Sequence, residues 1–192
     1  MSISTSTVLA SDPVHTDTYS VNAENSKVEW FAEKVTGKHN GEVQVKSGKI
    51  ANNHGKLTGM VTMDMTSIIV TDLEGKYKTK LENHLKSEDF FSVEEFGTAT
   101  FNITGIEPLK NASEGGENFK ISGDLTIKGI TNPISFPANI QFSGTGMTAK
   151  GTMVIDRSKF NVRYGSPSFF ADIGDKAIYD EFKLKFDLNA SK

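Results

Sequence analysis

The stretch KLTGMVTMDMTS, residues 56–67, decides the fold class because it alternates apolar and polar side chains. Leu57, Val61 and Met65 share one face of such an extended chain, with a glycine and a further methionine between them. A period of two residues is the pattern of a β-strand with one buried face. The same alternation recurs at residues 27–35, 42–46, 98–105, 119–127, 134–142, 148–155 and 180–190. We therefore expect about eight strands.

Segments rich in glycine and asparagine separate these strands and predict turns. We expect turns at 37–41, 52–55 and 129–133, and a hairpin loop at 108–118. Pro137 lies inside a strand pattern, so it needs an edge or bulge position. Residues 157–176 predict a long aromatic loop that contains Phe169 and Phe170.

The pattern changes between residues 71 and 86, where apolar side chains recur every four residues at Leu73, Tyr77, Leu81 and Leu85. This spacing predicts one amphipathic helix over about 71–86, with Thr71 or Asp72 as its N-cap. The helix leads into HLKSEDFFSVEEF, residues 84–96, which follows neither period. We expect its phenylalanine rings to be buried at one end of the β-structure.

A chain of 192 residues with this pattern is most simply one all-β domain, an eight-stranded antiparallel barrel. A β-sandwich is the structural alternative. The alternation does not separate a filled core from a ligand cavity, nor does it say which strand face lines the interior. Residues 1–18 are rich in serine and threonine and predict a disordered tail or the remnant of a removed leader.

Composition excludes several classes of protein. The net charge is −3 with acids and bases interspersed, so we expect no nucleic-acid partner. No apolar run approaches the roughly 20 residues of a membrane-spanning helix. The absence of cysteine excludes disulfides and thiolate nucleophiles without deciding the compartment.

Catalytic and metal-binding patterns are not found. His15, His39, His54 and His84 lack metal-ligand spacing, so we expect no metal and no resident cofactor. Asp156 and Arg157 are neighbours whose side chains start on opposite strand faces, so we expect each to contact other partners. We therefore expect no enzymatic activity. The chain instead offers 13 phenylalanines and several methionines for a deep apolar interior.

Three motifs, taken in order, resemble the YceI family of lipocalin-like polyisoprenoid-binding proteins. The first is His84-Leu85-x-Ser87-x-Asp89-Phe90-Phe91-x-Val93-x-x-Phe96, followed by Phe101. The second is GDLTIKGITNP at residues 123–133, and the third is IDRSKF at residues 155–160. The resemblance covers about residues 19–190. Gly97 and Asn161 depart from the family pattern, and both are residues that turns tolerate.

The resemblance implies a lipocalin-like barrel that holds a long isoprenoid or similar amphiphilic lipid as a carrier or storage protein. A polyprenyl chain, an isoprenoid quinone or a fatty-acid-like molecule is the implied ligand. It also implies a periplasmic or secreted location, no established catalysis and, often, a homodimer.

The strand faces and the aromatic segments nominate the ligand-binding residues. They are Val28, Trp30, Val61, Met63, Met65, Phe101, Ile103, Phe136, Ile140, Phe182 and Leu184 as lining, with Phe90, Phe91, Phe169 and Phe170 at the rim.

Two other functions stay open at this point. One is an enzyme that acts on a lipid inside the barrel, with His84, Asp89 or the Asp156-Arg157 pair as its acid, base or anion clamp. The other is a structural or outer-membrane barrel, which the alternation suits. Scarce tryptophan and tyrosine, glycines within the apolar faces and a polar C-terminal end weigh against the second.

Overall fold

Nine antiparallel strands form one continuous sheet in the computed structural model, which describes residues 16–192 except residue 111. The strands are β1 (Thr16–Val21), β2 (Lys27–Lys34), β3 (Gly37–Asn53), β4 (Lys56–Val70), β5 (Thr98–Pro108), β6 (Phe119–Ile127), β7 (Ile130–Phe142), β8 (Gly146–Asp156) and β9 (Ile178–Ser191). The helices are α1 (Gly75–Lys86) and two short 3-10 helices, η1 (Arg157–Phe160) and η2 (Gly174–Lys176).

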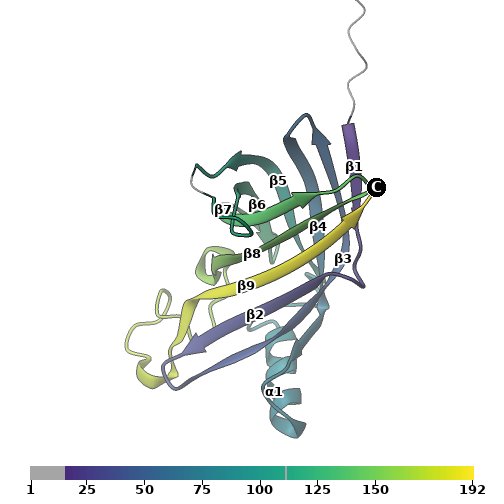
Figure 1. Cartoon of the computed structure of the whole chain (residues 1–192). Coiled ribbons are helices and arrows are strands. Elements are labelled where there is room, and N and C mark those ends of the chain that lie inside the picture. The colour runs from purple at the N-terminus through teal and green to yellow at the C-terminus, as the bar shows by residue number, and fades with distance from the viewer. Residues whose placement is uncertain (1–15, 111) are drawn as a thin grey trace, which may run out of the picture.

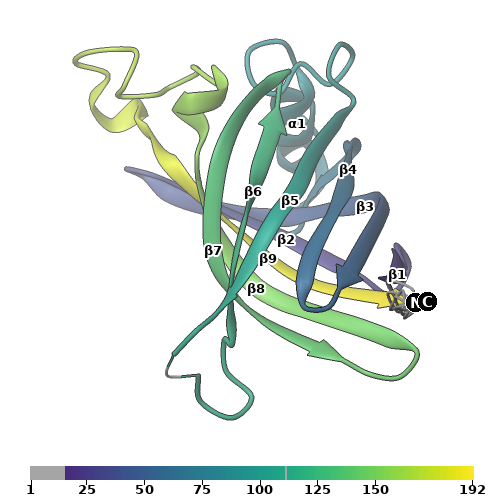
Figure 2. The same ribbon diagram turned by 90° about the horizontal axis from the view of Figure 1, so that it is seen from above.

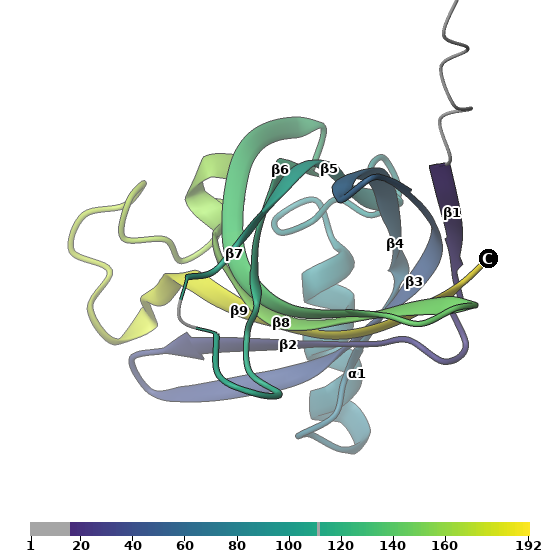
Figure 3. The same ribbon diagram turned by 45° about the horizontal axis from the view of Figure 1, so that its top comes forward.

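The sheet closes on itself as an eight-stranded barrel. Its order is β1-β3-β2-β9-β8-β7-β6-β5-β4, and the pairing of β3 with β4 completes the ring (Figure 3). Both β1 and β2 pair with β3 and β9, so they occupy one strand position that is interrupted between them. The predicted barrel is therefore confirmed, and the sandwich alternative is excluded.

The predicted alternation is reproduced in the burial of neighbouring side chains. On β2, Trp30 is 9% exposed and the adjacent Phe31 is 39% exposed. On β8, Ala149 is buried and Val154 lies on the opposite, exposed face. Because inward side chains from all sides of the ring meet inside it, the core lies within the barrel.

Two predicted turns belong instead to strands. Residues 37–41 begin β3, where Gly41 pairs with Trp30 of β2 and with Val70 of β4. A Cβ atom on Gly41 would lie 2.6 Å from the Trp30 ring, so this glycine leaves room for an aromatic side chain. Residues 130–133 likewise begin β7, and only Lys128 and Gly129 form the turn, both with positive φ.

Pro137 occupies a position that strand pairing permits. Every residue of β6 pairs with β7, and Pro137 pairs there with Lys120. The pairing of β7 with β8, in contrast, begins only at Ala138. The missing amide hydrogen of Pro137 therefore interrupts no bond to β8.

The predicted helix is present, but it begins later than expected and without the expected N-cap. Its N-cap is Glu74, which makes no side-chain capping bond. Asp72 is bound to β3 instead, where its carboxylate contacts His39 Nδ1 at 2.9 Å and accepts a hydrogen bond from the Asn40 amide. The helix lies at one end of the barrel (Figure 1), and Glu82 accepts a hydrogen bond from the Val70 amide there.

The other end of the barrel carries β1 and the C-terminus. Figures 1 and 2 show the C-terminus on the side of the barrel away from α1. Residues 16–18 of the expected tail belong to β1, because they pair with β3 beside the buried Tyr19. The rest of that tail, including His15, lies outside the described residues. No helix among residues 16–110 and 112–192 is long and apolar enough to span a membrane.

Candidate functional site

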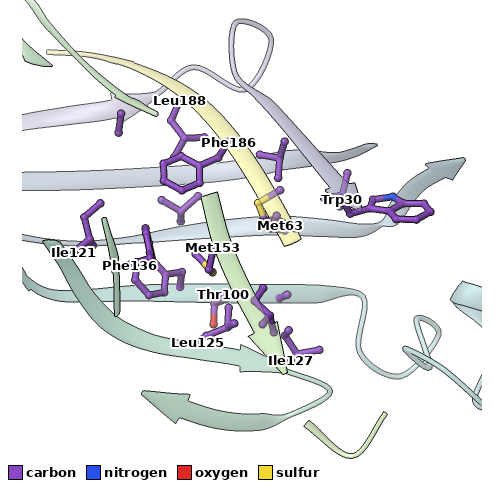
Figure 4. Close-up of a pocket in the computed structure, with 18 of the residues that line it drawn as sticks. Trp30, Met63, Thr100, Ile121, Leu125, Ile127, Phe136, Met153, Phe186 and Leu188 are labelled. Atoms are coloured by element: carbon purple, nitrogen blue, oxygen red, sulfur yellow. The ribbon is translucent and has the colours of Figure 1, made fainter. Parts of the chain in front are cut away.

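The inside of the barrel contains a cavity of about 170 Å³, which we call the lumen. Side chains from β2 to β9 and from the segment at the end of α1 line it, and Thr100 is the only polar residue among them. In Figure 4, Trp30 lies toward one end of the lumen, and Ile121 and Leu188 lie toward the other. The lumen is therefore an apolar space that runs along the barrel.

Three phenylalanine rings lie close together in the wall of the lumen. The ring centroids of Phe101 and Phe136 are 5.4 Å apart, and those of Phe136 and Phe186 are 5.6 Å apart. Gly151 of β8 pairs directly with Phe186, and a Cβ atom at this glycine would lie 2.8 Å from the Phe186 ring. The glycine therefore lets the ring lie against the neighbouring strand.

All the predicted lining residues, together with Phe90 and Phe91, line the lumen. Phe169 and Phe170 do not: they line neither of the two cavities described here, and they are 38% and 48% exposed. Their amides both donate to the Ser166 carbonyl in a turn that faces solvent, and Arg163 lies over the Phe169 ring. The two rings therefore lie outside both linings, and the ligand contacts of all the nominated residues stay a prediction.

Sequence reasoning left out several lining residues that its own pattern could have found. Ile121, Leu125 and Ile127 share the inward face of β6, and Met153 and Ile155 share that of β8. Both faces are visible as alternation. Leu85 of α1 also lines the lumen, which a helical period alone does not indicate.

A second cavity of about 520 Å³ adjoins the lumen at the α1 end, and we call it the vestibule. Trp30, Ala32, Leu85 and Phe90 line both cavities, so the two meet at these side chains. The rest of the vestibule wall comes from the β2–β3 hairpin, from Leu73 and α1, from the loop after η1 and from Ile178 at the start of β9. It includes polar and charged residues, namely Glu33, Lys34, His39, Tyr77, Lys80, His84 and Tyr164.

His84 is held in the vestibule wall between two aromatic rings. Its ring centroid is 4.3 Å from that of Tyr164 and 5.7 Å from that of Phe90, both in edge-on arrangements. Its Nε2 atom is buried and has no hydrogen-bond partner among the described residues. His39, in the same wall, is half-buried and forms an ion pair with Asp72.

Arg157 is buried next to this wall and contacts two of its residues, Phe90 and Tyr164. It is 3% exposed, and its guanidinium donates to the carbonyls of Val162, Tyr164, Ile178 and Tyr179. It also lies 3.4 Å from an Asp180 carboxylate oxygen. Burial lowers the pKa of the guanidinium, while Asp180 and Asp156 oppose that shift. With its donors occupied, the side chain serves to fix the backbone.

Asp156 takes a separate role, as the sequence led us to expect. Its carboxylate accepts hydrogen bonds from the amide and the hydroxyl of Ser158, which caps η1. At the other end of η1, Asn161 has a φ of +56°, which fits the turn-tolerant residue seen in the sequence. The third motif thus builds a structural corner.

The two cavities offer a ligand different kinds of contact. The lumen offers apolar contact, and the vestibule offers hydrogen-bond donors and charge at its mouth. No group of three or more histidine, aspartate or glutamate residues within the described part of the chain could hold a metal ion.

A closed eight-stranded barrel with an apolar lumen and one polar mouth defines a lipocalin-like binding-protein fold. The chain belongs to the YceI family: the model of the YceI-like domain matches residues 19–190.

Curated relatives include UPF0312 proteins of Staphylococcus aureus. Those of strains USA300 and N315 are 34% and 31% identical over 121 residues, which is 57% of this chain and 63% of each relative. The matched region therefore spans less than two thirds of the length of these relatives.

Solved structures share the fold. BcnA of Burkholderia cenocepacia is 26% identical, with a TM-score of 0.64 over 89% of this chain and 99% of its own. A polyisoprenoid-binding domain of Saccharophagus degradans, implicated in plant cell wall breakdown, is 12% identical, with a TM-score of 0.63 over 90% and 97%. A Campylobacter jejuni YceI protein is 20% identical, with a TM-score of 0.51 over 98% and 90%.

Proposed function

We propose that this protein binds a long-chain isoprenoid or similar amphiphilic lipid in the lumen, as a carrier or storage protein. The observation that carries the proposal is the apolar lining of the lumen, in which Thr100 is the only polar residue. Each methylene group that leaves water contributes about 0.8 kcal/mol, so a chain of several methylenes gains substantial affinity there. The polyisoprenoid-binding relative supports the same class of ligand.

The proposed ligand is a slender chain, and the side chains that line the lumen can adapt to its shape. The lumen volume of about 170 Å³ is below the roughly 300 Å³ at which pockets for drug-sized molecules begin. Met63 and Met153 line the lumen, and methionine side chains adapt readily to the shape of a neighbour. A single extended hydrocarbon chain meets these conditions better than a fused ring system.

The decisive experiment blocks the lumen without changing the fold. Ala149→Phe places a large ring into the lumen from β8, whereas Val154→Phe places the same ring on the outer face of the same strand. Native mass spectrometry after mild purification, followed by uptake of a polyprenyl alcohol, measures binding. We expect uptake by the unsubstituted protein and by Val154→Phe, and a loss of uptake in Ala149→Phe.

Two results would reject the proposal. One is an unsubstituted protein that neither carries a co-purified lipid nor takes up polyprenyl or fatty-acyl probes. The other is a folded Ala149→Phe protein that binds the probe as well as Val154→Phe does.

We also propose that the bound lipid leaves unchanged, so the protein is not an enzyme. The lining of the lumen holds no acid, base or nucleophile stronger than the Thr100 hydroxyl. The mass of a bound probe, measured before and after long incubation, tests this, and a shifted mass that depends on His84 would contradict it. The expected periplasmic or secreted location and the expected homodimer stay predictions for cell fractionation and size-exclusion chromatography.

A further inference from the structure

We propose that the vestibule is a head-group site that recognises an anionic carboxylate or phosphate on the lipid whose tail fills the lumen. In this site His84 Nε2 binds an oxygen of the head group, and Lys34 and Lys80 supply the charge. The inference rests on the proposed function, because the head group is placed by a tail bound in the lumen.

The first observation is the unsatisfied nitrogen of His84. Buried polar atoms are nearly always hydrogen-bonded, since an unmade bond costs about 1–3 kcal/mol. His84 Nε2 is buried without a partner among the described residues, and the residue lines the vestibule. The ring is also held in place by Tyr164 and Phe90. A fixed, unsatisfied nitrogen in a cavity wall is suited to a ligand atom.

The second observation is the charge around that nitrogen. Lys34 and Lys80 line the vestibule, and neither makes an ion pair with any residue in the described part of the chain. His39 of the wall contacts Asp72, which does not line the vestibule, and Glu33 is the one acid among the lining residues. Two free lysines against one acid give the vestibule a positive excess, which favours an anion over a neutral alcohol.

The third observation is the order of the two cavities. Trp30, Leu85 and Phe90 line both, so the apolar lumen opens directly into the charged vestibule. A lipid tail inside the lumen would therefore bring its head group to His84. Along the lumen, Thr100 is the one polar residue that the tail would meet. An amphiphile with an acidic head matches this gradient along its whole length.

The test compares ligands that share one tail. Hexadecanoate, hexadecyl phosphate and hexadecanol are titrated at neutral pH against the full chain, and inorganic phosphate serves as a head group without a tail. We expect the two acids to bind about tenfold more tightly than the alcohol, the value of one charge-assisted hydrogen bond. We expect no measurable binding of inorganic phosphate. The relative affinities of the two acids identify which anion the site prefers.

Substitutions assign that preference to the vestibule. His84→Phe keeps a ring between Tyr164 and Phe90 but removes Nε2, and Lys80→Met keeps the side-chain stem but removes the charge. We expect both variants to bind the two acids little more tightly than they bind hexadecanol, so that most of the preference for acids is lost. Lys76→Met is the matched control on the same helix, because Lys76 lies over the Tyr77 ring and does not line the vestibule.

The outcomes separate the two proposals. If the acids and the alcohol bind equally, or if His84→Phe and Lys80→Met keep the full preference, the head-group site is rejected and lumen binding stands. If inorganic phosphate binds as tightly as hexadecyl phosphate, the vestibule is a site for a soluble anion and the inference is overturned. If no probe with a tail binds, the proposed function itself fails.

Discussion

The guanidinium of Arg157 lies over the ring of Phe90, with Cζ 5.5 Å from the ring centroid. The same guanidinium donates to the Tyr164 carbonyl at 2.8 Å. Phe90 and Tyr164 are the two rings that contact His84. One buried cation therefore holds both aromatic neighbours of the histidine in the vestibule wall.

Replacing Arg157 should destabilise η1, the loop that follows it and the start of β9. In Arg157→Ala, four backbone carbonyls lose their donor and Asp180 loses its cationic neighbour, so we expect a loss of about 3–5 kcal/mol in the free energy of unfolding. Urea denaturation measures it. Arg163→Ala, which removes an exposed cation over Phe169, is the control, with an expected loss of about 0.5–1 kcal/mol. Similar losses in the two variants would show that the buried contacts contribute little.

Gly41→Ala should displace the only tryptophan. Its Cβ would overlap the Ile69 carbonyl oxygen and lie 2.6 Å from the Trp30 ring, whose Nε1 donates to that same carbonyl. We expect a loss of about 3 kcal/mol and a red-shifted tryptophan emission. Gly37→Ala on the same strand is the control, because the nearest side-chain atom to its Cβ would be 3.9 Å away. Unchanged emission in Gly41→Ala would contradict the close packing of Trp30 and Gly41.

The ionised Asp64 carboxylate should add to the free energy of unfolding, and this contribution should be lost at low pH. The Thr66 hydroxyl is the main cause that holds the pKa of the Asp64 carboxyl below its ordinary value of 3.8. A lowered folded-state pKa stabilises the fold above the unfolded value, and this contribution is lost as the pH falls through the folded value.

This contribution is measured as the difference in the free energy of unfolding between the unsubstituted protein and Asp64→Asn, followed as a function of pH. We expect it to be constant above about pH 5 and to shrink below about pH 4. Glu114→Gln, in an exposed loop, should show no such change in the same range. A difference for Asp64→Asn that stays level down to pH 2 would refute the assignment.

Trp30 should report which end of a ligand lies at the mouth. It lines both cavities, so bromine atoms near the head of a bound hexadecanoate should quench its fluorescence more than bromines near the methyl end. The unbrominated acid corrects for any change that binding itself causes. Stronger quenching by the methyl-end bromines would mean that the chain enters the lumen in the reverse direction.

Strand faces were the part of this molecule that the sequence predicted well. The alternation of inward and outward side chains is a property of a single strand and can be read from its own sequence. Val61, Met65 and Phe136 could therefore be assigned to the interior without knowing which strands lie beside them. The glycine at position 41 misled the prediction, since its role is set by Trp30 on another strand. Thr71 and Asp72 misled it too, because their partners are on β3 and outweigh helix capping.

The vestibule could not be predicted in the same way. Lys34, His39, Lys80 and Tyr164 come from four separate elements, and no spacing along the chain relates them. His84 was visible within a motif, but its unsatisfied nitrogen depends on where Tyr164 and Phe90 pack. The exposed pair Phe169 and Phe170 shows the converse, because aromatic residues in a loop need not reach the cavity that the barrel encloses.

Lys192 at the C-terminus and Asp17 in β1 form an ion pair of 2.8 Å. The C-terminus and β1 lie on the side of the barrel away from α1 (Figure 1). A tether, a fusion partner or a solid support attached at either of these ends would thus hold the barrel by its base. The opening beside α1 would then point away from the attachment and stay accessible to a ligand in solution.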